Sequence, residues 1–221
     1  MRFPGFHRDP AEVTDSGIDL YWLPLGAGGR SVRFNGRVYE AFVAALERRE
    51  RCALYHSALE VRVPDGRFVI EMTPVVGGGN GDRGVVAGGA VGSRLVGRLD
   101  LFRYEVRCWR DGQIPDVAEA VESPRRISDD PVLARRILDL APLVPTPTWG
   151  RDELSTGDMW NSNSLVSWLL VSAGIGVAQA VLPVGGRAPG WDAGVAVAKR
   201  GRASRERLRL DLGEERGGGV L

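Results

Sequence analysis

Three polar residues, His56, Glu71 and Ser162, have side chains that together can perform acyl-transfer chemistry. An imidazole can accept the proton of a hydroxyl nucleophile, and a carboxylate can fix the imidazole tautomer and stabilise the imidazolium. This chemistry requires hydrogen-bond contact between the three groups. The elements that carry them must therefore bring together residues that lie far apart in the sequence.

The histidine and the glutamate fall on two neighbouring strand-like runs, residues 52–63 and 68–73. Pro64-Asp65-Gly66 separates the runs and is a turn signal typical of hairpins. The sequence therefore predicts an antiparallel hairpin with His56 and Glu71 on the same face.

The expected register limits how close the two side chains come. A turn at Asp65-Gly66 places Glu60 opposite Glu71, so that His56 lies four residues further along, about 13 Å at about 3.3 Å per residue. Direct contact then requires a bulge, a strong twist or a different loop. Without it, the pattern describes a half-buried histidine and a solvated glutamate on a hairpin.

Ser162 lies where a helix is expected to begin. Residues 159–173 are largely apolar and end at Gly174, and residues 161–164 are rich in capping side chains. A hydroxyl in the first turn lies near the positive end of the helix dipole, where a developing anion is stabilised. In the alternative interpretation, these polar residues only cap an apolar helix.

The passages YHSALEV, RFVIEMTP and NSNSLVSWLL together resemble the lecithin:retinol acyltransferase-like proteins and their NlpC-type relatives, which have a circularly permuted papain-like fold. The resemblance covers mainly residues 52–73 and 158–174, with the histidine strand before the nucleophile helix. It implies that His56 is the base, Glu71 the third polar residue and Ser162 the nucleophile. The family has a cysteine where this chain has Ser162.

This resemblance implies a hydrolase or acyl transferase acting on an amide, ester or thioester of a small molecule or peptide. The oxyanion would be bound by backbone amides near Ser162 and Asn163, with Asn161, Asn163 and Trp160 lining the site. No metal or organic cofactor is required. Loss of the thiol equally fits a catalytically inactive papain-like binding or interaction module. A third alternative is a partner subunit whose aromatic loops form an interface.

Composition restricts the partners. The chain has 29 basic and 28 acidic residues, a formal charge of +1, so we expect no nucleic-acid partner. The apolar run from Ser164 to Gly176 is too short to span a bilayer. The two cysteines are far apart and no secretory signal is evident, so we expect a cytoplasmic protein. The oligomeric state is left open.

The order of elements favours an α+β fold in which a small antiparallel sheet packs against helices. We expect a flexible arm over residues 1–16, a single domain over 17–200 and a mobile tail over 201–221. Further predicted elements are strands at 18–23, 99–109 and 195–197, and helices at 38–49 and 128–140.

Three loops complete the prediction. The glycine-rich segment 77–97 is expected to be a flexible loop that can act as a lid. Residues 149–153 and 186–192 combine tryptophan with charged side chains. They fit either the lining of a pocket near the helix start or arginine–carboxylate contacts that hold the fold together, and the second interpretation is favoured.

Overall fold

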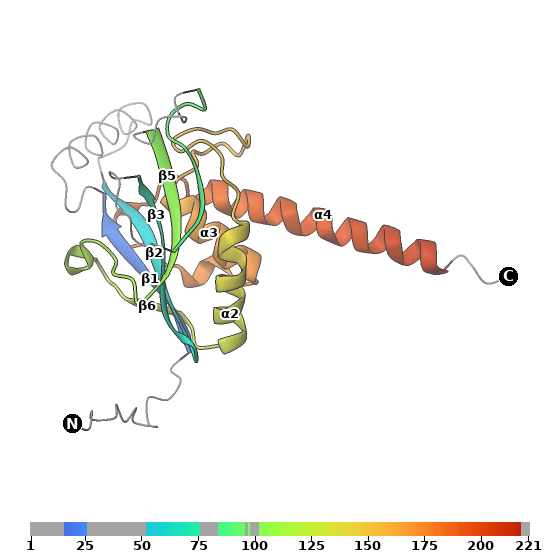
Figure 1. Cartoon of the computed structure of the whole chain (residues 1–221), viewed down its shortest axis with the longest axis horizontal. Coiled ribbons are helices and arrows are strands. Elements are labelled where there is room, and N and C mark those ends of the chain that lie inside the picture. The colour runs from blue at the N-terminus through green and yellow to red at the C-terminus, as the bar shows by residue number, and fades with distance from the viewer. Residues whose placement is uncertain (1–15, 26–51, 76–83, 96, 98–101, 218–221) are drawn as a thin grey trace, which may run out of the picture.

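The computed structural model describes residues 16–25, 52–75, 84–95, 97 and 102–217. A mainly antiparallel sheet packs against helices, which confirms the predicted α+β class. Figure 1 shows α2 and α3 beside the sheet, and α4 extending away from both. The predicted arm, apart from Ser16, and the predicted helix at 38–49 lie outside the described residues.

The described part of the sheet has seven strands: β1 (Gly17–Pro24), β2 (Ala53–Val63), β3 (Gly66–Pro74), β4 (Val85–Ala90), β5 (Arg103–Arg110), β6 (Arg125–Ser128) and β7 (Gly186–Arg187). Six of them follow the order β4-β5-β3-β2-β1-β6 with antiparallel neighbours. The short β7 pairs with the start of β2 in parallel.

The β2–β3 hairpin has the predicted face pattern but a different register. The turn is at Pro64-Asp65, so that Val63 pairs with Gly66 and Leu59 pairs with Ile70. This differs by two residues from a turn at Asp65-Gly66. Because side chains alternate with a period of two, a two-residue shift leaves every side chain on its expected face.

The two faces of the sheet have different surroundings. The main core covers one face, where Leu20, Leu59 and Ile70 pack with helices α2 and α3. The opposite face carries a smaller buried cluster of Leu23, Ala58, Val69 and Ile114. Successive strand residues point to opposite faces, so the neighbouring strands β1, β2 and β3 contribute to both clusters.

The helices of the described residues are α2 (Pro131–Leu140), α3 (Ser162–Ala173) and α4 (Trp191–Gly217), with the 3-10 turns η2 (Val117–Glu119), η3 (Ala141–Leu143) and η4 (Val177–Gln179). Asp130 caps α2 ahead of Pro131, so the helix begins three residues after the predicted start at 128. Every residue of α3 is buried, its serine and asparagine side chains included.

Three segments differ in local structure from what their sequence predicts. Residues 195–197 lie inside α4 and form no edge strand. Residues 201–217, expected as a tail, continue the same helix. Within the glycine-rich segment, residues 85–90 form strand β4 instead of a loop, because their backbone pairs with β5.

Candidate functional site

His56 projects from β2 away from the helices. The neighbouring residue Ser57 hydrogen-bonds to α3. Leu23, which pairs with His56 across β1 and β2, belongs to the cluster on the opposite face of the sheet. Strand alternation therefore places the His56 side chain on that opposite face. Burial lowers the pKa of His56 to about 4, and the charge of Asp116 only partly opposes this shift. The imidazole is neutral at physiological pH.

Glu71 lies on the same face as His56 but interacts with another residue. It pairs across β3 and β5 with Arg107, whose Nη1 is 3.6 Å from Glu71 Oε1. The side chain is buried, and Oε1 has no hydrogen-bond partner in the described part of the chain. Burial raises the pKa of Glu71, although the charge of Arg107 acts in the opposite direction.

The sheet does not bring His56 and Glu71 into a shared ladder. Backbone pairing between β2 and β3 ends at Leu59 and Ile70. Beyond that point β2 continues to pair with β1, whereas β3 continues to pair with β5. No hydrogen bond or ion pair joins His56 to Glu71 among the described residues, and the carboxylate lies instead beside Arg107.

Ser162 is the first residue of α3 and lies on the other side of the sheet from His56. The helix packs on the main-core face, and the side chain of Ser162 is buried. His56 projects from the opposite face, so the strand itself separates the expected base from the expected nucleophile. The structure does not assemble the three expected catalytic groups into one site.

One of the expected oxyanion donors, the backbone N–H of Asn163, is occupied by a helix cap. Asn161 is the N-cap of α3, and its Oδ1 accepts hydrogen bonds from the backbone N–H of Asn163 at 2.9 Å and of Ser164 at 3.4 Å. Ser164 Oγ in turn accepts from the Asn161 N–H at 3.0 Å, which completes a capping box. These contacts match the alternative interpretation, in which the polar residues cap the helix.

Asn163 is the residue of the α3 start that contacts β2. Its Oδ1 accepts a hydrogen bond from Ser57 Oγ at 2.9 Å. Its Nδ2 donates to the backbone oxygens of Tyr55 at 2.9 Å and of Pro189 at 2.8 Å. Both ends of the amide are therefore satisfied, and the position facing β2 presents neither a nucleophile nor a free donor.

Other polar side chains from this region bind the segment Pro189–Trp191, and we call the set the α3 clasp. It consists of Asp158, Asn161, Asn163, Ser164 and Ser167. Each of these side chains has a hydrogen bond of 2.6 to 2.8 Å to a backbone group of the segment.

The α3 clasp fixes the start of α4. Trp191 begins that helix, and its ring packs on Trp22 of β1 with the centroids 5.2 Å apart. Gly194 follows at the crossing of α4 over α3, where an added Cβ would collide with Ser164 O and Ser167 Oγ. The polar residues around Ser162 thus position a helix.

Trp160, expected to line the site, is a core residue. Its side chain is 1% exposed and packs in the main cluster, and its Nε1 has no hydrogen-bond partner in the described part of the chain. Its backbone pairs with the loop before it, where Gly150 N donates to Trp160 O and Trp160 N donates to Arg151 O. It therefore belongs to the packing of the fold.

The loop at 149–153 contains the predicted arginine–carboxylate contact. Glu153 pairs with Arg94 at 2.8 Å and accepts hydrogen bonds from Thr148 N at 3.0 Å and Thr148 Oγ1 at 2.7 Å. These bonds, with that of Arg94 the largest cause, lower the pKa of Glu153 to about 2. Arg151 Nε donates to Gly92 O at 2.7 Å.

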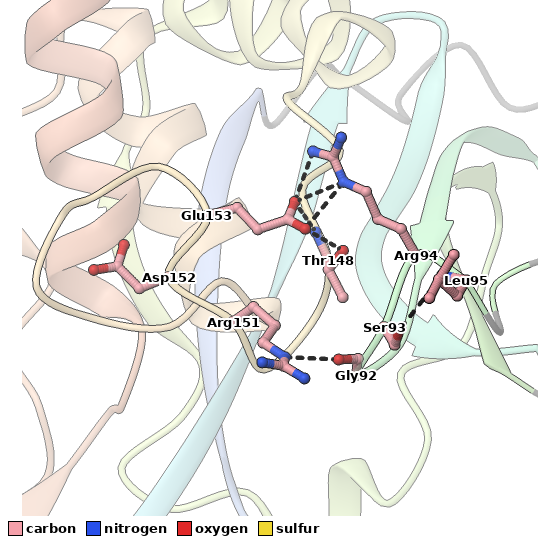
Figure 2. Close-up of a pocket in the computed structure, with 8 residues that line it drawn as sticks. All are labelled: Gly92, Ser93, Arg94, Leu95, Thr148, Arg151, Asp152 and Glu153. Carbon is pink, nitrogen blue, oxygen red and sulfur yellow. Dashed lines mark hydrogen bonds and ion pairs between the residues drawn. The ribbon is translucent and has the colours of Figure 1, made fainter.

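Figure 2 shows these side chains around an open hollow of about 510 Å³. The carboxylate of Glu153 points toward the Arg94 guanidinium and the Thr148 backbone, and Arg151 reaches the opposite wall at Gly92. Arg94 and Glu153 pair with each other, whereas Arg151 and Asp152 form hydrogen bonds to Gly92 and to Thr156 and Gly157. The arrangement holds the 92–95 turn against the 148–153 loop.

The described residues contain no group of three or more His, Cys, Asp or Glu side chains suited to a metal ion. Among the helices described, none is both long and apolar enough to cross a membrane. The sequence reasoning missed the α3 clasp, although the alternation of Asn and Ser over residues 161–164 is a capping signal. Comparison with protein-family models, curated proteins and solved structures gives no match to this chain.

Proposed function

We propose that this protein is a non-catalytic binding or interaction module and not a serine hydrolase. The observation that carries the proposal is the placement of His56 and Ser162 on opposite sides of the sheet. A serine nucleophile needs its base within hydrogen-bond reach, because the hydroxyl proton must be removed as the new bond forms. The residue that contacts β2 in its place is Asn163, whose amide is fully hydrogen-bonded.

The extension of α4 supports an interaction role. The helix has 27 residues, which corresponds to about 40 Å at 1.5 Å per residue. Residues 202–207 are exposed and mostly charged. Because this part of α4 has only exposed side chains, it gains little from packing within the chain, so contact with a partner is the expected source of its stability. The permuted papain-like resemblance remains a prediction.

A serine-directed fluorophosphonate probe tests the proposal. The intact folded protein should show no labelling, in a reaction that labels a known serine hydrolase in the same tube. Labelling of the wild type that disappears in Ser162→Ala, but persists in the matched variant Ser172→Ala, would overturn the proposal. Ser162→Cys should likewise gain no activity toward thiol-directed acyl substrates, because the expected base, His56, lies on the other side of the sheet.

A further inference from the structure

Arginines from two helices converge on a hollow between α2 and α4. The hollow measures about 260 Å³ and is lined by Arg136 of α2 and by Arg202, Arg205 and Glu206 of α4. Gathering three guanidinium groups against one carboxylate costs free energy through repulsion, unless an anion binds between them. The chain as a whole has a net charge of only +1, so this positive charge is a local feature.

Two of these arginines have no ion-pair or side-chain hydrogen-bond partner in the part of the chain that the structure describes. Arg135, next to Arg136, pairs with Asp65, and Arg200 donates to the backbone oxygens of Leu154 and Ser155. By contrast, Arg136 and Arg205 form no ion pair or side-chain hydrogen bond within the described residues.

Arg202 has a partly structural role at the edge of the same hollow. Its Nη1 donates to Val171 O at 3.5 Å, in the last turn of α3. A cation there stabilises the negative end of the α3 dipole. Arg136 and Arg205 are therefore the side chains available to a ligand.

We infer that this hollow is the docking site for an acidic segment of a partner protein, whose carboxylates pair with Arg136 and Arg205. The inference rests on the proposed function as an interaction module and names its contact surface. A guanidinium presents two parallel N–H donors that match the two oxygens of a carboxylate. Two arginines on neighbouring helices can thus bind successive acidic side chains of one segment.

The charge order along α4 favours an acidic protein segment over a nucleic acid. Residues 199–209 contain six basic residues and one acidic residue, whereas Asp211, Glu214 and Glu215 follow directly. A phosphate backbone that tracked along the helix would meet this acidic stretch and be repelled. A short acidic segment that contacts only the α2–α4 hollow avoids the repulsion.

Fluorescence anisotropy with a labelled ten-residue oligoglutamate peptide and the full chain tests the inference. Binding should be measurable in 50 mM salt and should weaken about tenfold in 300 mM salt, since exposed charges are screened. R136Q/R205Q should weaken binding by at least about fivefold. The matched variant R103Q/R110Q removes two exposed charges from β5, outside the hollow, and should change it less than about twofold.

Circular dichroism and thermal unfolding establish that both double variants are folded. Equal weakening in the two variants, or no peptide binding in 50 mM salt, would overturn the inference. The inference would also be overturned if a labelled ten-nucleotide single-stranded DNA bound more tightly than the peptide and R136Q/R205Q abolished that binding. If the peptide does not bind and the fluorophosphonate probe does not label the protein, only the inference about this hollow is wrong. If the probe labels Ser162, the proposed function itself is wrong.

Discussion

Ser57 Oγ donates a 2.9 Å hydrogen bond to Asn163 Oδ1, and this contact joins the central strand β2 to the first turn of α3. Both side chains are almost completely buried. In a papain-like enzyme, a nucleophile on the helix faces a base on the strand. Here the facing groups are a hydroxyl and an amide that satisfy each other, which makes the junction a structural contact.

Asn163→Ala should destabilise the fold by about 2–4 kcal/mol, because a buried polar group left unpaired costs about 1–3 kcal/mol. The substitution removes the acceptor of Ser57 Oγ and the hydrogen bonds from Asn163 to Tyr55 O and Pro189 O, although Pro189 O still accepts from Asn161 Nδ2. Urea denaturation followed by tryptophan fluorescence measures the free energy of unfolding.

Ser57→Ala is the matched control for that variant. It removes one hydrogen bond and leaves Asn163 with its two backbone acceptors, so a loss of about 1 kcal/mol is expected. If Asn163→Ala costs no more than Ser57→Ala, the amide does not have the structural role assigned to it.

Gly194→Ala should destabilise the protein by about 3 kcal/mol through overpacking of the α3–α4 crossing. An added methyl group would collide with Ser164 O and Ser167 Oγ, and neither the helix backbone nor the buried hydroxyl can move freely. Thermal unfolding monitored by circular dichroism measures the effect.

Gly201→Ala, at a glycine further along α4, is the control for Gly194→Ala. A Cβ there meets only Arg205 Nη1 at 3.7 Å, so the higher helix propensity of alanine should stabilise the helix by up to about 1 kcal/mol. Similar unfolding temperatures for the two variants would contradict the close approach of α3 and α4 at Gly194.

The sequence predicts the hairpin faces well because they depend on a period of two, which a register shift of two residues preserves. It therefore places His56 and Glu71 on one face correctly. The partner of Glu71 cannot be read from this pattern, because β5, with Arg107, joins β3 only through long-range pairing. The separation of β2 and β3 beyond Leu59 and Ile70 is also a tertiary effect.

The start of α3 shows a different limit of sequence reasoning. Asn161 to Ser164 correctly predict a capped helix, and the capping box is present. Capping residues do not determine how a helix packs on a sheet. They therefore cannot show which residue of the first turn faces β2, or whether any of them reaches His56. The structure turns Asn163 toward β2, whereas the family resemblance implies that Ser162 is the central residue.

Glu71→Gln should change the pH dependence of stability in a defined direction. The pKa of Glu71 is higher in the folded protein than its ordinary value, so the folded state binds the proton more tightly than the unfolded state. The wild type should therefore gain stability relative to Glu71→Gln as pH falls from 7 toward 4. Urea denaturation of both proteins across this range measures the difference in their free energies of unfolding. If the wild type instead lost stability relative to Glu71→Gln, burial would not raise the pKa of Glu71.

His56→Leu should remove an acid sensitivity of the wild type. The pKa of His56 falls from 6.5 to about 4 on folding, so the unfolded chain takes up the proton first and the fold loses stability as pH decreases between these values. If His56 were fully shielded, the free energy of unfolding would decrease by about 2 kcal/mol between pH 7 and pH 5. Because His56 is partly exposed, this value is an upper limit. Denaturation curves at pH 7 and pH 5 should show a smaller loss for His56→Leu than for the wild type. Equal losses in the two proteins would mean that His56 titrates normally and is not shielded on its sheet face.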